Sequence, residues 1–252
     1  MLAEGAVFAF LGGLAAGSFV TVVAHRVPRG ESIVGPRSRC PGCGTQIAAY
    51  DNVPVLSWLL LLGRGRCCDE AISVRYPLAE LGLGLVYLAT VLVLRHDPAQ
   101  LAMGLVLVTA LMAVTITDLE RRVIPNKILM VTAVAGVAIA LLFDPSSLPE
   151  RAIAAVAAGG LLFAAALAYP SGMGLGDVKL AAVMGFFLGR NVAPALLVAL
   201  VAGSVVGLAL IAREGASARK KAIPFGPFLA LGAVAGLLLG NELVGWYLGT
   251  FS

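Results

Sequence analysis

Charge is scarce in this chain. Only 13% of its 252 residues are Asp, Glu, Lys or Arg, whereas 60% are hydrophobic and the mean hydropathy is +0.96. A soluble globular domain carries about 25% charged residues, so the composition excludes an ordinary soluble domain and indicates an integral membrane protein. Alternation of apolar and polar residues is also lacking, which favours a helical bundle over a β-barrel.

Three further absences narrow the possible functions. No GxGxxG motif follows a strand-like segment, which excludes a Rossmann-type nucleotide site. No basic run is interleaved with aromatic residues, so we expect the lipid bilayer as the surroundings and no nucleic-acid partner. The two histidines, His25 and His96, have no catalytic partner near them in the sequence, and both are interpreted as ordinary residues near the ends of spans.

Runs with little or no charge predict about eight transmembrane helices. The sixth is the weakest, because residues 180–189 alone cannot cross; a start at Gly172 gives 18 residues, or ~27 Å, close to the ~30 Å hydrocarbon core. The first run lacks a basic segment before it and is predicted to be a retained span. The eight runs lie at about 5–24, 77–94, 98–117, 128–143, 152–170, 172–189, 192–212 and 228–248.

The longest polar segment, residues 25–76, carries all four cysteines. We therefore expect an all-α membrane protein in three parts: a first transmembrane helix at 1–24, a small cysteine-containing cytoplasmic domain at 25–76, and a membrane domain of seven helices at 77–252.

The distribution of Lys and Arg predicts the orientation. With the N-terminus outside, 15 of the 18 basic residues fall in cytoplasmic loops, and only Arg95, Arg151 and Arg190 fall outside. This agrees with the positive-inside rule. Both termini are then expected outside, and Asp118 and Asp177 are expected at the cytoplasmic side.

Those two aspartates stand at the ends of apolar runs. Asp118 follows residues 101–117, which contain no charge, and Asp177 ends the glycine-rich segment 172–177. An ionisable group at membrane depth indicates function by default. Two neighbouring carboxylates cannot both ionise easily, which is the requirement of an aspartic protease. The alternatives are an interfacial aspartate at a helix end for Asp118 and a helix N-cap for Asp177.

The expected chemistry follows from one shared proton. One carboxylate would act as general base on a water, and the protonated one would donate to the scissile carbonyl, with no metal needed. Gly174 and Gly176 remove side chains near Asp177, so an extended peptide backbone can approach it. Lys179 could bias which carboxyl group keeps the proton, or it could face the cytoplasm.

The cysteines form two pairs. Cys40 and Cys43 make a CxxC knuckle of the type that holds structural zinc. The second pair is Cys67 and Cys68, and Gly65 stands where a second CxxC would begin. We expect zinc ligands at Cys40, Cys43 and Cys68, with Cys67 uncertain because adjacent cysteines hold one tetrahedral ion awkwardly. The alternative is a domain that has partly lost its metal site.

Seven ordered motifs resemble the bacterial type IV prepilin peptidases, which are membrane aspartic proteases of the GxGD kind. Two positions depart from the family pattern, Thr21 after GSF and Gly65 in the second knuckle. The motifs are GSF (17–19) with HRVP (25–28), PRSRCPGC (36–43), YDNVPVLSW (50–58), ISVRYP (72–77) with Glu80, DL (118–119) with IPN (124–126), GLGD (174–177) with Lys179, and IPFGP (223–227).

The resemblance implies a substrate class. Type IV prepilins and pseudopilins would lose their basic leader at the cytoplasmic face of the bacterial inner membrane, with Asp118 and Asp177 as the catalytic pair. It also implies N-methylation of the new N-terminus with S-adenosylmethionine. Glu80 and Gly84 are weak candidates for that second site; alternatively, Glu80 is a structural carboxylate paired with Arg75 or a backbone group.

Two rival hypotheses remain open from the sequence. One is a peptidase that lacks methyltransferase activity. The other is an ion-coupled secondary transporter, because a glycine-broken helix beside a carboxylate is also how such carriers are built. Against the transporter, the first half shows no matching glycine-broken segment, and the cysteine domain has no explanation there.

Overall fold

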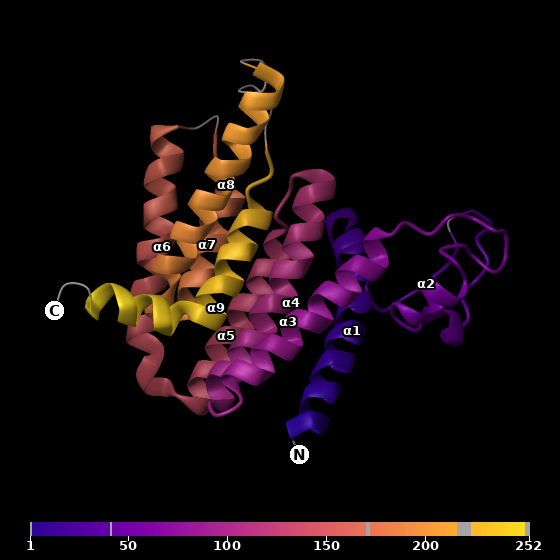
Figure 1. The fold of residues 1–252 in the computed structure, drawn as a ribbon, viewed down its shortest axis with the longest axis horizontal. Coiled ribbons are helices and arrows are strands. Elements are labelled where there is room, and N and C mark those ends of the chain that lie inside the picture. Colours follow the sequence, from indigo (N-terminus) through magenta and orange to yellow (C-terminus); the bar gives the residue numbers. More distant parts are fainter. Residues whose placement is uncertain (1, 41, 170–171, 216–222, 250–252) are drawn as a thin grey trace. The chain divides into compact units, whose positions relative to one another are not determined.

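The computed structural model describes residues 2–40, 42–169, 172–215 and 223–249 (Figure 1). Pro41 of the first knuckle, and Arg219, Lys220 and Lys221 of the predicted cytoplasmic loops, lie outside the described residues. Within the described residues the regular elements are helices, and the only β pairings are two isolated bridges. The long helices are α1 (Leu2–Arg26), α3 (Arg75–Leu94), α4 (Pro98–Arg121), α5 (Asn126–Phe143), α6 (Leu148–Ala168), α7 (Leu175–Leu188), α8 (Val192–Glu214) and α9 (Gly226–Gly249).

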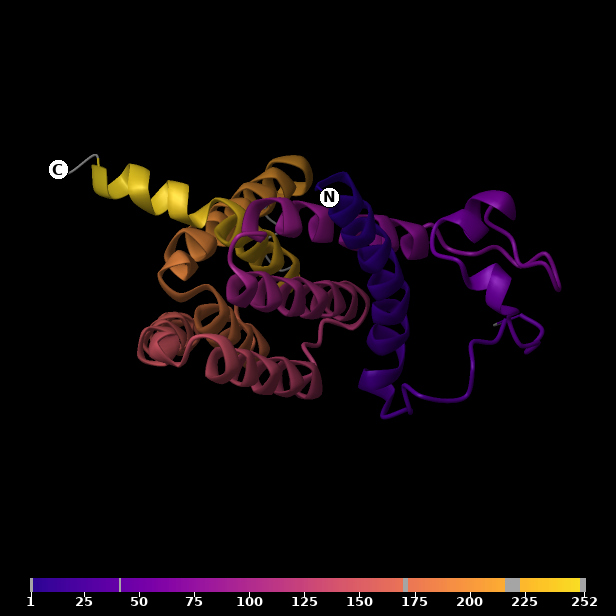
Figure 2. The same cartoon turned by 90° about the horizontal axis from the view of Figure 1, so that it is seen from below.

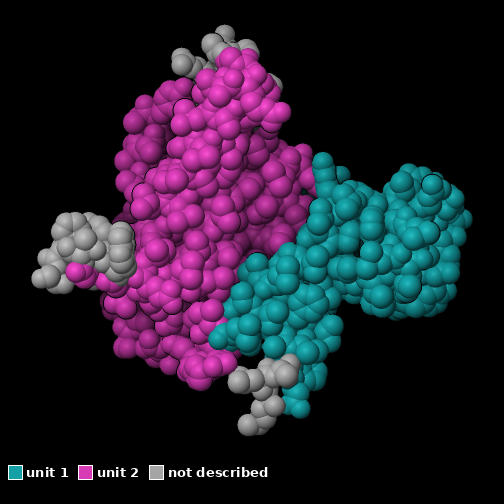
Figure 3. Space-filling view, viewed as in Figure 1, with its two compact units in different colours: residues 1–92 teal, residues 93–252 magenta. Residues whose placement is uncertain are grey.

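The chain divides into two compact units, residues 1–92 and 93–252 (Figure 3). In the first unit, α1 and α3 approach closely through glycines. A Cβ at Gly13 would lie 2.7 Å from Gly84 Cα, and a Cβ at Gly17 would lie 2.6 Å from Glu80 Cα. Small residues allow such backbone contact between membrane helices. The cysteine-containing segment between them forms the short elements η1 (Val27–Arg29), η2 (Ala49–Asn52) and α2 (Leu56–Leu60).

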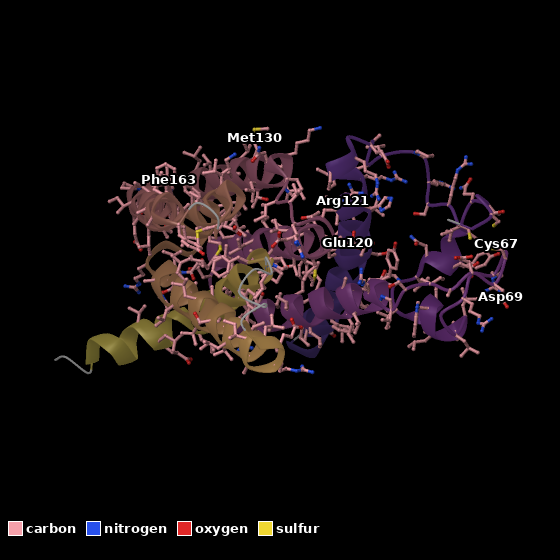
Figure 4. All side chains as sticks on the ribbon, turned by 90° about the horizontal axis from the view of Figure 1, so that it is seen from above. Cys67, Asp69, Glu120, Arg121, Met130 and Phe163 are labelled. Atoms are coloured by element: carbon pink, nitrogen blue, oxygen red, sulfur yellow. The ribbon has the colours of Figure 1, made fainter. Side chains whose placement is uncertain are left out.

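The second unit is a bundle of α4 to α9. Helix α4 contacts α5, α7 and α9, while α6 packs along α7 and α8 packs along α9 (Figures 1 and 2). Its outer faces carry exposed apolar side chains, among them Met130 on α5 and Phe163 on α6, which point away from the bundle (Figure 4). Such faces suit lipid, because lipid tails are as apolar as these side chains.

Seven stretches of the described chain are long and apolar enough to cross a membrane. Six of them contain one long α-helix each, but the stretch Leu175–Glu214 has 40 residues. At 1.5 Å per residue it would measure ~60 Å, twice the hydrocarbon core. It is broken at η4 (Gly189–Asn191), where Gly189 has φ +55°, and the two halves are α7 and α8. The expected all-α membrane architecture of about eight helices is therefore confirmed.

The sixth span is shorter than its predicted range. The crossing at 172–189 was expected to begin with irregular, glycine-rich backbone, and α7 begins only at Leu175, after an extended Gly174 (φ −85°, ψ 151°). The glycine-rich approach to Asp177 is thus not helical. Helix α7 has 14 residues, or ~21 Å.

Candidate active site

Asp118 lies in the last turn of α4 and is 6% exposed. The helix continues past it to Arg121 and ends where Arg122 adopts a left-handed conformation (φ 54°). The Gly226 N–H, at the start of α9, donates a 2.8 Å hydrogen bond to Asp118 Oδ2. Asp118 is therefore a buried carboxyl group near the end of α4, held against the N-terminus of another helix.

The position of Gly226 leaves no room for a side chain. A Cβ there would lie 2.7 Å from Asp118 Oδ2 and 3.2 Å from its Cβ. The N-terminus of a helix presents unpaired N–H groups and a partial positive charge, both of which stabilise an anion. Sequence reasoning gave Gly226 no role beyond its motif; the available signal was a Gly-Pro pair at a helix start, since proline favours the first turn.

Asp177 lies in the first turn of α7, and its side chain turns back to bind Gly174, the residue before the helix. Its Oδ2 accepts the Gly174 N–H at 3.2 Å, and its own N–H donates to the Gly174 carbonyl at 3.1 Å. Asp177 thus makes a capping interaction from inside the helix, with Gly174 in the N-cap position. This interaction fixes the carboxyl group at the end of α7 that the glycine-rich segment approaches.

The two glycines beside Asp177 have different surroundings. A Cβ at Gly176 would lie 3.0 Å from Ile124 Cβ, so Gly176 lets α7 approach the turn after α4. A Cβ at Gly174 would have its nearest neighbour at 3.5 Å, which is Asp177 Oδ2. Packing among the described residues therefore accounts for glycine at 176 and does not require it at 174.

The structure brings the two predicted aspartates together. Helices α4 and α7 contact each other, and the two carboxyl groups are close enough to interact electrostatically. Lys179 donates to Asn126 Oδ1 at 3.0 Å and so ties α7 to the start of α5. The arrangement is two carboxyl groups at one end of the bundle, each accepting a backbone N–H.

A cavity of about 290 Å³ lies elsewhere in this unit. It is lined by Gln100 and Met103 at the start of α4 and by Gly189–Asn191 after α7. Met103 is ~22 Å along α4 from Asp118. The cavity is therefore at the opposite end of these helices from the aspartates.

All four cysteine sulfurs in the first unit gather in one cluster. Each Sγ lies within 4.8 Å of the others; Cys40 to Cys68 is 3.4 Å, Cys43 to Cys67 is 3.2 Å, and Cys67 to Cys68 is 3.9 Å. Four thiolates around one zinc at ~2.3 Å would be separated by ~3.8 Å. The cluster therefore fits a metal ion, and Cys67 lies within it as closely as the three cysteines favoured from the sequence.

The four thiols differ in acidity. The hydrogen bond between Cys43 Sγ and the Thr45 hydroxyl, 3.3 Å long, contributes most to lowering the pKa of Cys43 to about 6. Hydrogen bonding to Cys43 raises the pKa of Cys67 to about 12. Because a thiol must be deprotonated to bind a metal, Cys43 is the ready ligand of this pair at neutral pH.

Glu80 is 8% exposed and has a backbone partner. Its Oε2 accepts the Val55 N–H at 2.7 Å. Val55 has φ 60° and ψ −49°, and the Leu56 N–H donates to the Pro54 carbonyl at 2.6 Å, which is a γ-turn with a positive φ at a β-branched residue. Such a conformation costs of order 1–3 kcal/mol and persists only when its surroundings hold it. Of the alternatives for Glu80, the backbone partner is observed.

Gly84, the other weak candidate for methylation, has a packing role. A Cβ there would lie 2.9 Å from Leu14 Cδ2 and 3.1 Å from Phe10 Cε2. A larger residue there would displace the Leu14 or Phe10 side chain of α1.

Comparison with protein families covers both units. Residues 11–94 match the bacterial peptidase A24 N-terminal domain, and residues 105–212 match the type IV leader peptidase family. The chain is also 35% identical to a prepilin leader peptidase/N-methyltransferase of Aeromonas hydrophila, over 96% of this chain and 93% of that protein. The chain belongs to the type IV leader peptidase family.

Other relatives in the family carry the same name. The protein of Myxococcus xanthus is 39% identical over 83% of this chain and 64% of its own length. That of Bacillus subtilis is 32% identical over 95% of this chain and 96% of its own. No solved structure matched the chain significantly. Asp118 and Asp177 fall inside the leader peptidase match and the four cysteines inside the N-terminal match, whereas Gly226 lies beyond both.

Proposed function

We propose that this chain removes the leader from type IV prepilins and pseudopilins with Asp118 and Asp177, and methylates the new N-terminus. The observation that carries the proposal is the pairing of these two carboxyl groups inside the segment that matches the leader peptidase family. Family membership supports a peptidase that also methylates, and it argues against the transporter alternative.

The cleavage step needs one carboxylate and one carboxylic acid. The carboxylate takes a proton from water, the hydroxide attacks the scissile carbonyl carbon, and the acid protonates the carbonyl oxygen. Collapse of the tetrahedral intermediate breaks the C–N bond, and a proton passes to the leaving amine. Glycine at 174 puts no side chain beside Asp177, which would let the substrate backbone approach it.

The two hydrogen bonds support a division of roles between the aspartates. Asp118 accepts a buried N–H at 2.8 Å from the N-terminus of the 24-residue helix α9, whereas Asp177 accepts an exposed N–H at 3.2 Å from a loop. Both carboxyl groups lie at a helix N-terminus, since Asp177 is in the first turn of α7. The difference is the hydrogen-bond donor, and the shorter, buried bond favours the ionised form at Asp118. Asp118 is therefore the general base in this proposal, and Asp177 holds the proton.

The membrane placement follows the charge distribution. Both termini would lie outside the bacterial inner membrane, with the aspartates and cysteines toward the cytoplasm. A prepilin has a basic leader followed by an apolar helix, so its helix would lie in the bilayer and its leader junction would meet Asp118 and Asp177.

A reconstituted reaction tests this function directly. Full-length protein in lipid vesicles is mixed with a prepilin and S-adenosylmethionine, and the mature N-terminus is analysed by mass spectrometry. We expect loss of the leader and gain of one methyl group. Cleavage without methylation would identify a peptidase that lacks the second activity, and an intact prepilin would contradict the proposal.

We expect metal chelation to leave leader cleavage within about twofold of the untreated rate, because the aspartates activate water without a metal. We propose zinc only at the cysteine cluster, where it would hold the cytoplasmic segment in its fold. Cleavage is measured before and after chelator treatment. Complete loss that zinc restores, in a sample that stays folded, would contradict a metal-free peptidase.

Glu80→Ala is expected to lower methylation at least about tenfold while cleavage changes about twofold or less. The substitution leaves the Val55 N–H without its acceptor, at a cost of about 1–3 kcal/mol, and frees the strained turn at Val55. We propose that this part of the first unit, around Glu80, takes part in methylation. Glu80→Gln keeps an acceptor oxygen and serves as the matched control. The fraction of methylated product is measured; equal losses of both activities would show a general loss of stability instead.

A further inference from the structure

The two cysteine pairs lie on two turns with the same backbone hydrogen bonds. In the first turn, the Cys40 N–H donates to the Thr45 carbonyl at 2.8 Å, and the Gly44 N–H donates to the Cys40 carbonyl at 2.9 Å. In the second turn, the Gly65 N–H donates to the Glu70 carbonyl at 2.8 Å, and the Asp69 N–H donates to the Gly65 carbonyl at 2.9 Å.

Each residue of the second turn stands 25 positions after its counterpart in the first, and two further features repeat at this spacing. Gly44 and Asp69 both have positive φ, +71° and +59°. An isolated antiparallel bridge closes each turn, from Arg39 to Gln46 and from Arg64 to Ala71. The second turn therefore keeps the knuckle fold, with Cys68 in the place of Cys43 and Gly65 in the place of Cys40.

Position 65 of the second turn has no thiol, but Cys67, two residues later, does. Cys67 corresponds to Gly42 on the first turn, and a Cβ built at Gly42 would lie 3.3 Å from Cys68 Sγ. This position of the knuckle therefore faces the opposite turn. On the second turn it carries a thiol, and Cys67 Sγ lies 3.2 Å from Cys43 Sγ.

We propose that Cys67 is the fourth ligand of the metal site and replaces the missing cysteine at position 65. The expected ligands are Cys40, Cys43, Cys67 and Cys68, with zinc as the metal that four thiolates in a tetrahedron favour. This inference rests on the proposed metal site and is independent of the aspartate chemistry.

The structure also has room for a cysteine at position 65 in place of the one at position 67. A Cβ at Gly65 would lie 3.9 Å from Cys40 Sγ and 3.6 Å from the Glu70 carbonyl oxygen, both ordinary contacts. The φ of Gly65 is not in the positive range, so a cysteine fits its backbone. Gly65→Cys combined with Cys67→Ser would rebuild an ordinary CxxC knuckle.

The test measures metal binding by the full-length protein in detergent. Zinc content and affinity are determined, and the absorption of the cobalt(II)-substituted protein reports the number of thiolates. We expect one zinc per chain and four thiolates. Cys67→Ser should bind zinc more than about 100-fold more weakly, beyond the ~10–100-fold cost of losing a group that only hydrogen-bonds a ligand.

The double variant Gly65→Cys/Cys67→Ser should return to within about tenfold of the wild-type affinity, with four thiolates. Gly65→Ala/Cys67→Ser adds the Cβ without the thiol and should stay weak. Leader cleavage by each sample shows that the membrane unit is folded. Wild-type affinity in Cys67→Ser, or no recovery in the double variant, would overturn the proposal. A wild-type chain that binds no zinc would overturn the metal site itself and leave the aspartate pair untouched.

Discussion

Asp118→Asn and Asp177→Asn are each expected to reduce leader cleavage by at least about 10³-fold. An amide in place of Asp118 cannot accept the proton of water. An amide in place of Asp177 has no acidic proton to give to the carbonyl oxygen of the scissile bond. General acid–base catalysis by one positioned group contributes about 10²–10⁴-fold, and the two groups act as a unit. The measurement is prepilin cleavage by purified protein in vesicles.

The control for this pair is the second activity of the same sample. Methylation of a prepilin peptide that has already lost its leader should persist in both variants, since the aspartates lie in the second unit and the proposed methylation residues in the first. Cleavage retained by either variant would exclude that residue from catalysis. Loss of both activities would instead indicate a folding defect.

Gly226→Ala is expected to lower kcat for cleavage about 100-fold or more, with KM changed about threefold or less. The new Cβ would lie 2.7 Å from Asp118 Oδ2, so either the carboxyl group or the start of α9 must move. A misplacement of about 1 Å in a catalytic group can cost about 10²-fold. Because Gly226 contacts Asp118, a proposed catalytic group, the loss should appear in kcat.

Gly207→Ala is the matched control, because a Cβ at Gly207 in α8 would meet nothing within 4 Å. It should cleave at the wild-type rate and unfold at the same or a higher temperature, since alanine is the better helix former. Thermal unfolding of both variants is compared. A Gly226→Ala protein with unchanged kcat would show that the α9 contact does not position Asp118.

The helices could be predicted from sequence because the bilayer sets their length. A span needs about 20 apolar residues, and run lengths alone located α4, α5 and α8 closely. Glycine content indicated irregular backbone before Asp177, but apolar composition did not reveal that Asp177 caps α7 from inside and leaves Gly172–Gly174 outside the helix. The start of α7 depends on a local hydrogen bond, which hydropathy does not report.

The site was only half visible in the sequence. The ionisable residues were found, because a charge beside an apolar run stands out. Gly226 was missed as a contributor, because its contact with Asp118 joins residues 108 positions apart. Cys67 was left uncertain because adjacent cysteines hold one tetrahedral ion awkwardly. The sequence does not show the positive φ of Asp69 or the hydrogen bonds of its turn, in which both sulfurs join the cluster.

The short length of α7 creates a hydrophobic mismatch at the aspartates. Fourteen residues cover ~21 Å of a ~30 Å core, which leaves about 9 Å uncovered. A bilayer adapts to a short helix by thinning around it. In the orientation that we propose, thinning at the Asp177 end of α7 would bring the water boundary to the peptide bond, and a pilin helix would stay in the lipid while its leader is cut.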